Sequence, residues 1–338
     1  MMKIAIIGAG IAGLSCACEL ERNGVSPTIF EKKSYIYNSF DTNICIFNNS
    51  SKLYSDPIEY LRKQYGIELH PIARLTKVIL NGPDNQTILE KNLGYIFKRG
   101  MEEYSLSNQL SKNLKSPITF DTYINSTEEL SKSFDHVVVA TGNYNIAKSL
   151  DLSTSVSSTR VKLALIYGEF ETGTLTVWFD EKFAKSSYAY MIAHSNKQAI
   201  ITLVVNDVSY SEMEFYWKEF LSILENKYTF IATVDLDYYT FLIKHIRINN
   251  TFFIGNSGGL IDDFLGHGII NSIESGVLAA RTIITGDDYV SAIQPLIDEV
   301  KGFRKSLTSF EDSDYSVENF IFRLPGLKGS FDLSTMAR

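Results

Sequence analysis

The sequence has 338 residues, which is more than one hydrophobic core usually supports, and 45% of them are hydrophobic. We therefore expect roughly two domains with well-filled cores. Its 32 basic residues are outnumbered by 39 acidic residues, and the net charge of -7 argues against a nucleic-acid-binding surface.

The sequence lacks the patterns of a membrane span and of a secretion signal. No apolar stretch approaches the ~20 residues that a transmembrane helix needs, and the N-terminus leads directly into a glycine motif. The three cysteines, Cys16, Cys18 and Cys45, lack the CxxC spacing of metal sites. We expect a cytoplasmic protein without a disulfide framework or a metal site. Peripheral membrane contact and the oligomeric state stay open.

The first 33 residues have the pattern of a dinucleotide-binding βαβ unit. The apolar run 4–7 leads into Gly8-Ala9-Gly10-Ile11-Ala12-Gly13 and a helical stretch, and the apolar run 27–30 ends at Glu31. In such a unit the glycines allow a pyrophosphate to approach the helix N-terminus, and the acid binds a ribose diol. An acid here selects a free 2'-hydroxyl, so the pattern predicts FAD or NAD. The alternative is a plain strand–helix turn with a solvated Glu31.

The next elements are less regular. Residues 34–55 predict a loop, 58–65 a helix, 75–80 and 86–89 a hairpin, and 95–97 a short strand. A helical stretch to residue 114 follows Lys98-Arg99-Gly100 and places Arg99 near the pyrophosphate. A solvated arginine at a strand end is the alternative.

Strands that suit a parallel sheet come next, at 118–120 and 136–140. The second is fully apolar and ends in Ala140-Thr141-Gly142. Such small residues allow the backbone to approach a nucleotide, although they also suit a simple turn.

Residues 160–207 have the sequence pattern of an antiparallel sheet, with strands expected at 161–167, 174–179, 188–193 and 199–205. Trp178, Tyr188 and Tyr190 would suit one wall of a pocket for a bulky apolar substrate. The alternative is that these aromatics fill the sheet core, because strands favour them in any case. A helix is expected over 211–226.

A second glycine-rich block follows a strand at 250–254. It runs Gly255-Asn256-Ser257-Gly258-Gly259, continues through Gly266-His267-Gly268, and enters a helix at Ile269. We predict that this block is a second contact on the same cofactor. The cofactor domain would then comprise 1–73, 94–158 and 245–305, with a substrate domain at 74–93 and 159–244 and a C-terminal helical tail at 306–338.

These motifs resemble the FAD-dependent oxidoreductases of the para-hydroxybenzoate hydroxylase fold, and most closely the geranylgeranyl reductase family. The resemblance implies an α/β fold in which a Rossmann-like FAD/NAD(P)-binding domain carries an inserted antiparallel β-sheet substrate domain. That family has Asp in place of Asn256 and Pro in place of Asp263. Tyr188 and Tyr190 match only two positions of its substrate-domain motif, and Cys45 is the candidate for its cysteine near the flavin.

The motifs and the resemblance together predict three sets of site residues. The cofactor-binding set is Gly8, Gly10, Ile11, Ala12, Gly13, Glu31, Lys32, Arg99, Ala140, Thr141, Gly142, Gly255, Asn256, Gly266, Gly268 and Ile269. The catalytic set is His267, Asp263 and Cys45, and the substrate-binding set is Trp178, Tyr188 and Tyr190. For His267 the alternative is an exposed loop histidine, and for Asp263 a helix cap.

The resemblance implies an FAD-dependent reductase that acts on an apolar or aromatic small molecule. Since the chain has a single GxGxxG motif, NAD(P)H is expected as a transient electron donor rather than as a permanently bound cofactor. Two alternatives remain: a flavin-dependent monooxygenase, and a nucleotide-binding protein without catalytic activity.

Overall fold

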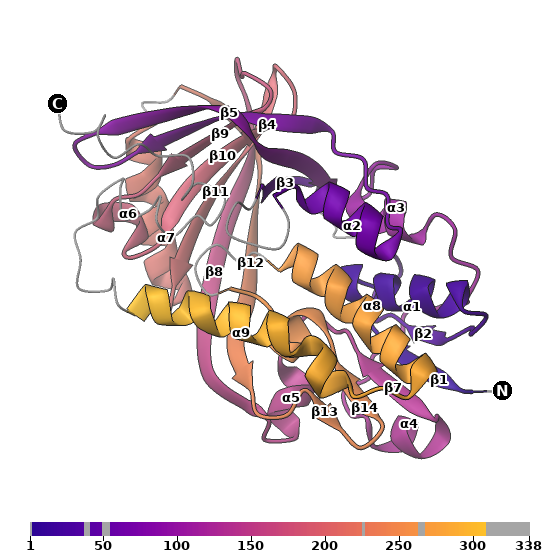
Figure 1. The fold of residues 1–338 in the computed structure, drawn as a ribbon. Coiled ribbons are helices and arrows are strands. Elements are labelled where there is room, and N and C mark those ends of the chain that lie inside the picture. The colour runs from indigo at the N-terminus through magenta and orange to yellow at the C-terminus, as the bar shows by residue number, and fades with distance from the viewer. Residues whose placement is uncertain (1, 37–40, 49–54, 225–226, 263–267, 309–338) are drawn as a thin grey trace. The chain divides into compact units, whose positions relative to one another are not determined.

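The computed structural model describes residues 2–36, 41–48, 55–224, 227–262 and 268–308 (Figure 1). The chain divides into two units. Unit 1 comprises Met1–Ser39, Gly100–Ser158 and Tyr238–Lys305, and the body of unit 2 comprises Phe40–Arg99 and Thr159–Asp237. The predicted tail at 306–338 lies outside the described residues, except for the last three residues of α9.

Unit 1 is built on a six-stranded sheet with the order β13-β14-β7-β1-β2-β6. The strands are β1 (Ile4–Ile7), β2 (Thr28–Phe30), β6 (Ile118–Thr119), β7 (His136–Val139), β13 (Arg247–Ile248) and β14 (Thr251–Phe253). All pairings are parallel except that of β13 with β14. The central strand β1 is buried along its whole length, as its unbroken apolar sequence predicts for a parallel sheet.

The described helices of unit 1 lie between these strands in the chain or follow the last of them, β14. They are α1 (Ile11–Arg22), α3 (Leu106–Ser111), α4 (Glu128–Ser133), α5 (Asn145–Ser149), α8 (Ile269–Thr285) and α9 (Tyr289–Thr308), with the short 3-10 helix η1 at Gly255–Gly258. Helices α1 and α8 lie side by side (Figure 1). A Cβ on Gly276 of α8 would lie 2.4 Å from the Ala12 carbonyl oxygen of α1, so only glycine allows this close crossing.

Unit 2 is built on an eight-stranded sheet with the order β12-β8-β11-β10-β9-β4-β5-β3. The strands are β3 (Thr42–Phe47), β4 (Ala73–Asn81), β5 (Gln86–Arg99), β8 (Ser153–Tyr167), β9 (Thr174–Trp178), β10 (Tyr188–Ala193), β11 (Gln198–Asn206) and β12 (Thr229–Ile243). From β8 to β3 the neighbouring strands of this order pair antiparallel, except that β4 pairs with β9 in parallel. The sheet curls, because Asn43 Nδ2 of the edge strand β3 donates to the Ala193 carbonyl of β10 at 3.0 Å.

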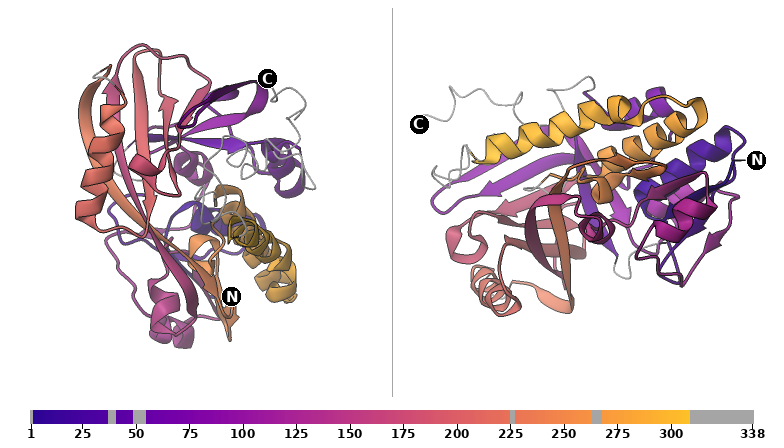
Figure 2. Two further views of the ribbon diagram at one scale, coloured as in Figure 1. Left: turned by 90° about the vertical axis from the view of Figure 1, so that its left-hand side faces the viewer. Right: turned by 90° about the horizontal axis from the view of Figure 1, so that it is seen from below.

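Helix α7 (Tyr210–Ser222) covers one face of this sheet (Figure 2). It begins with a capping box in which the Ser209 side chain accepts from the Glu212 backbone and Glu212 accepts from the Ser209 backbone. Met213, Trp217 and Phe220 of α7 pack against strands β8, β10 and β11. Two short helices, α2 (Pro57–Tyr65) and α6 (Glu181–Ala184), complete the unit.

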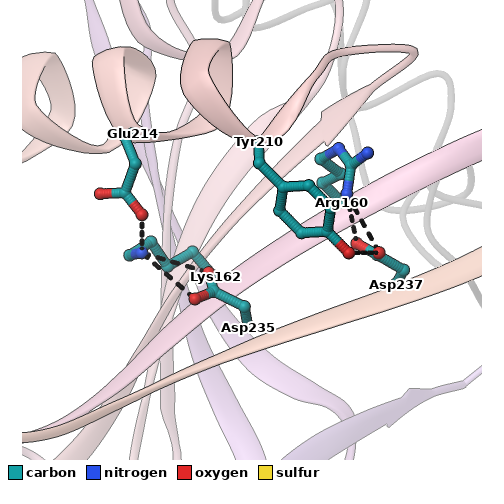
Figure 3. Close-up of polar contacts among 6 residues, drawn as sticks. All are labelled: Arg160, Lys162, Tyr210, Glu214, Asp235 and Asp237. Carbon is teal, nitrogen blue, oxygen red and sulfur yellow. Dashed lines mark hydrogen bonds and ion pairs between the residues drawn. The ribbon is translucent and has the colours of Figure 1, made fainter.

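Charged groups join α7 and β12 to β8 (Figure 3). The Lys162 side chain of β8 is only 8% exposed, and it pairs with Glu214 of α7 and with Asp235 of β12. Arg160 pairs with Asp237 at 3.0 Å, stacks over the Tyr210 ring, and shares Asp237 with the Tyr210 hydroxyl. The two cations therefore tie three elements together without leaving a buried charge unpaired.

The units differ from the predicted domains at their boundaries. Residues 40–73 and 94–99 were predicted in the cofactor domain, but they belong to unit 2 because β3 pairs with β5 and β5 with β4. Residues 238–244 belong to unit 1. The loop predicted over 34–55 contains β3, so that part of the prediction is wrong.

The described part of the chain contains no helix that is both long and apolar enough to cross a membrane. In the same residues, no group of three His, Cys, Asp or Glu side chains is placed to hold a metal ion. The cytoplasmic location stays a prediction.

The buried hydroxyl of Tyr289 anchors the start of α9 to the parallel sheet by donating to the Phe253 carbonyl of β14 at 3.0 Å. We expect Tyr289→Phe to lower the free energy of unfolding by about 1 to 2 kcal/mol, because the buried carbonyl loses its donor. Urea unfolding followed by circular dichroism measures this loss. The control is Tyr123→Phe, which alters an exposed tyrosine of the same unit. Equal losses in the two variants would contradict the assignment.

Candidate dinucleotide-binding site

The turn between β1 and α1 is closed by backbone contacts. Gly8 has a φ of +108° and donates its N–H to the Phe30 carbonyl at 2.7 Å. A Cβ on Gly8 would lie 2.4 Å from the Ala140 carbonyl oxygen, and one on Gly13 would lie 2.0 Å from the Gly8 carbonyl oxygen. Neither position can accept a side chain, so the turn brings β1, the end of β7 and the first turn of α1 into direct contact.

Gly10, by contrast, faces open space. It is the N-cap of α1, its φ of -80° suits any residue, and a Cβ built on it would meet no protein atom within 4 Å. It provides no side-chain cap for the helix, and the first turn of α1 contains no acidic residue. Unpaired N–H groups and a positive helix end therefore adjoin a space that can take an anion, as in a phosphate site.

Glu31 is held beside this turn. Its carboxyl group is buried, with 9% of the residue exposed. Oε2 accepts from the Ala9 N–H at 2.8 Å and Oε1 accepts from the Lys33 N–H at 3.0 Å. Each oxygen keeps a further lone pair, so both can still accept from ribose hydroxyls. Lys32, also predicted as a cofactor ligand, is exposed.

The segment after β7 contacts the second glycine block. The Ser257 hydroxyl of η1 accepts from the Gly142 N–H at 3.0 Å and lies 3.1 Å from the Thr141 hydroxyl. Ser257 was not predicted as a site residue, because a serine between glycines gives no signal of its own. It links η1 to the predicted trio of Ala140, Thr141 and Gly142.

The second glycine block also adjoins α1, as predicted. A Cβ on Gly255 would lie 2.9 Å from the Ala12 Cβ, and the Gly255 N–H donates to the Ser275 hydroxyl of α8 at 2.9 Å. Gly268 is the uncapped N-cap of α8, and a Cβ there would lie 3.0 Å from Asn256 Oδ1.

Unit 1 therefore brings together most of the predicted cofactor ligands. The Gly8–Gly13 turn with Ile11 and Ala12, Glu31, the trio at 140–142, Gly255, Asn256, Gly268 and the half-buried Ile269 all belong to it. The predicted residues Asp263, Gly266 and His267 lie outside the described residues. Their proposed roles stay predictions.

Three predicted residues gather in unit 2 instead. Arg99 ends β5, and Tyr190 is its titratable neighbour there. Cys45 of β3 is also a neighbour of Tyr190. Burial raises the pKa of the Cys45 thiol, which keeps it protonated at neutral pH and argues against a thiolate role.

The predicted aromatic wall needs a correction. Trp178 is paired with Ala189, so it points to the α7 face, where its ring centroid lies 5.7 Å from that of Phe220. Tyr188 and Tyr190 alternate with Ala189 and point to the opposite face, with ring centroids 6.0 Å apart. Trp178 therefore fills the sheet core, and only the two tyrosines can share a binding surface.

Comparison with known proteins gives a family match for the N-terminal segment and several solved structures with a similar fold. The family of NAD(P)-binding Rossmann-like domains matches residues 6–53, which include the glycine turn and Glu31. No curated protein matches the sequence. A solved geranylgeranyl bacteriochlorophyll reductase-like protein from Thermoplasma acidophilum is 12% identical, with 97% of each chain covered and a TM-score of 0.67.

Two further solved structures have similar values. The flavin-dependent brominase Bmp2 is 12% identical over 96% of this chain and 92% of its own, with a TM-score of 0.63. The oxygenase of 2-methyl-3-hydroxypyridine-5-carboxylic acid is 13% identical over 92% of this chain and 90% of its own, with a TM-score of 0.61. The chain shares their fold. The predicted resemblance is thus confirmed for the α/β fold with its inserted sheet, while the three activities differ.

The contrast between Gly13 and Gly10 gives a test of the turn. We expect Gly13→Ala to lower the free energy of unfolding by about 3 kcal/mol, because the new Cβ meets the Gly8 backbone. Gly10→Ala should change it by less than about 1 kcal/mol, since its Cβ enters open space. Urea unfolding of both proteins without added nucleotide measures the difference. Equal stability of the two variants would refute this description of the turn.

Proposed function

We propose that the chain is an FAD-dependent oxidoreductase. The observation that carries the proposal is the open space at Gly10, which the uncapped N-terminus of α1 and the fixed carboxylate of Glu31 adjoin. The second glycine block, only a van der Waals contact away from α1, supports FAD over a shorter nucleotide. The likeness to a flavin-dependent brominase and to a reductase-like protein supports the same cofactor.

Different residues of unit 1 would bind different parts of FAD. The two carboxylate oxygens of Glu31 would accept from the adenosine ribose, and the first N–H groups of α1 would bind the pyrophosphate. Asn256 would contact the ribityl or diphosphate portion, since its side-chain amide both donates and accepts. The N-terminus of α8, capped only by Gly268, would favour negative charge on the reduced cofactor.

Bound FAD would supply the two-electron redox chemistry of the reaction. The chain's contribution would be to bind the cofactor and to orient it. NAD(P)H is the proposed transient donor, because a single dinucleotide motif is present. His267 and Asp263 remain the proposed groups for proton transfer or orientation near the second glycine block.

For the reaction we propose the reduction of an apolar or aromatic small molecule, which the likeness to the reductase-like protein supports. Oxygenation is the second candidate, and the similar fold of the pyridine carboxylic acid oxygenase favours it. A nucleotide-binding protein without catalysis is the third, because Asn256 replaces the acid of the related family.

Flavin binding tests the cofactor. Purified protein mixed with FAD should show a bound flavin band at about 450 nm after gel filtration. We expect Gly10→Val to lose at least about 90% of this band, since its side chain would fill the space the pyrophosphate needs. The control is Gly302→Val, at an exposed glycine of α9. A Gly10→Val protein that is folded and fully loaded with flavin would refute the placement.

Oxygen dependence separates the two reaction types. With NAD(P)H and an unsaturated apolar substrate, a reductase forms saturated product equally well with and without oxygen. A monooxygenase forms hydroxylated product only with oxygen, and its oxygen uptake matches product. We expect the first result, read by mass spectrometry of the product under argon and under air. Product formed only under air would favour oxygenation. If NAD(P)H is oxidised neither under argon nor under air, the non-catalytic protein is favoured.

A further inference from the structure

Unit 2 contains a guanidinium group that no carboxylate of the described chain neutralises. Arg99 is the last residue of β5 and pairs in register with Thr42 of β3. Other cations of this unit have carboxylate partners within 3.2 Å: Lys77 with Glu171, Arg160 with Asp237, and Lys162 with Asp235. Arg99 differs from them because it is paired with no acidic group among the residues that the structure describes.

The curl of the sheet determines what surrounds Arg99. Asn43 of β3 bonds to the Ala193 carbonyl of β10, which draws the edge strand toward the middle of the sheet. Tyr190 lies three residues before Ala193, and Cys45 lies two residues after Asn43. Arg99 of β5 and Cys45 of the adjacent strand β3 therefore become neighbours of Tyr190, although β10 is separated from both strands in the sheet order.

The protonation states of these groups favour a donor site. Burial lowers the pKa of Arg99, and the Tyr190 phenol opposes this shift, yet a guanidinium stays charged at neutral pH. Burial raises the pKa of Tyr190 above its usual value, although interactions with the Thr202 side chain and with the charge of Arg99 oppose the rise, so the phenol keeps its proton. Among the described residues, the cluster thus presents a cation and neutral hydrogen-bond donors.

Arg99 is half-buried, and a cation partly removed from water without a carboxylate partner is costly for a folded protein unless a ligand binds to it. A guanidinium fork matches a carboxylate or a phosphate in a bidentate pair, and a phenol can add a third donor. The ring of Tyr188 lies beside that of Tyr190 on the same face of the sheet, which adds aromatic surface for an apolar group. An acidic group attached to an aromatic or apolar body fits all of these features.

We propose that Arg99 and Tyr190 form an anion-binding subsite in unit 2, which takes the carboxylate or phosphate group of a small aromatic or apolar substrate. This proposal rests on the proposed function, because it names the class of molecule that the oxidoreductase would bind. It also replaces the role predicted for Arg99 as a ligand of the cofactor pyrophosphate. Tyr188 and Tyr190 keep their predicted role in substrate binding.

Calorimetric titration of the full-length protein tests the subsite with three probes of similar shape. Benzoate and phenyl phosphate carry the anion, and benzamide is the neutral counterpart. At constant ionic strength we expect one of the two anions to bind about tenfold or more tightly than benzamide. The anion that binds more tightly identifies the acidic group. If benzamide binds as well as both anions, or if no probe binds, the proposal is overturned.

Variants of Arg99 and Tyr190 show which side chains cause the preference for the anion. We expect Arg99→Met to abolish the preference for the anion and Arg99→Lys to retain part of it, while Tyr190→Phe should weaken anion binding several-fold. The matched control is Arg74→Met, which removes an exposed arginine of the same sheet and should leave the preference unchanged. A loss in Arg74→Met equal to that in Arg99→Met would overturn the assignment to Arg99. Should Arg99→Met fail to fold, Arg99→Lys and Tyr190→Phe decide.

Flavin content, measured on each variant, separates this subsite from the cofactor site. If Arg99→Met loses FAD together with the anion preference, Arg99 serves the cofactor and the proposal is overturned. If the wild-type protein binds no FAD at all, the proposed function fails. The anion preference can still be measured in that case, because the titration needs no flavin.

Discussion

The candidate site depends on two close contacts of the α1 backbone, one on each side of the helix. On one side the Gly8 carbonyl lies where a Cβ of Gly13 would be, and on the other the Ala12 carbonyl lies where a Cβ of Gly276 would be. These two contacts hold the first turn of α1 between the end of β1 and helix α8. Since the N–H groups of that turn are the anion-binding groups, their direction is set by packing rather than by a ligand.

An ion pair extends the same contact along α1. The Glu19 side chain is only 7% exposed, and it pairs with Arg281 of α8 at 2.7 Å and with Arg22 of its own helix. A buried carboxylate without a partner would destabilise the pair of helices, whereas a paired one fixes the register of α1 against α8. That register keeps Gly255 and Gly268 near the N-terminus of α1. The two glycine blocks, far apart in sequence, therefore act as one surface.

The parts of the site that the sequence could predict are those whose signal is local. The Gly8–Gly13 turn, Glu31 and the strand 136–139 all follow from residue type and spacing over a short stretch, and β1, β2 and β7 form where expected. Strand β3 could not be predicted, because residues 42–47 alternate weakly and pair with a partner about fifty residues away. Ser257 was missed for the same reason, since its meaning comes from Gly142, which is distant in sequence.

Unit 2 shows why composition alone could not assign the aromatic residues. Trp178, Tyr188 and Tyr190 have similar strand propensity, and only the pairing of Trp178 with Ala189 shows that the sheet separates them. The α7 face is covered by an apolar cluster that includes Trp217, Phe220 and Leu203, and its burial stabilises the unit. The opposite face carries the tyrosines and receives Cys45 and Arg99 through the curl of the sheet. Because the two faces are built from alternating residues of the same strands, a stable core on one face allows polar and charged residues to be tolerated on the other.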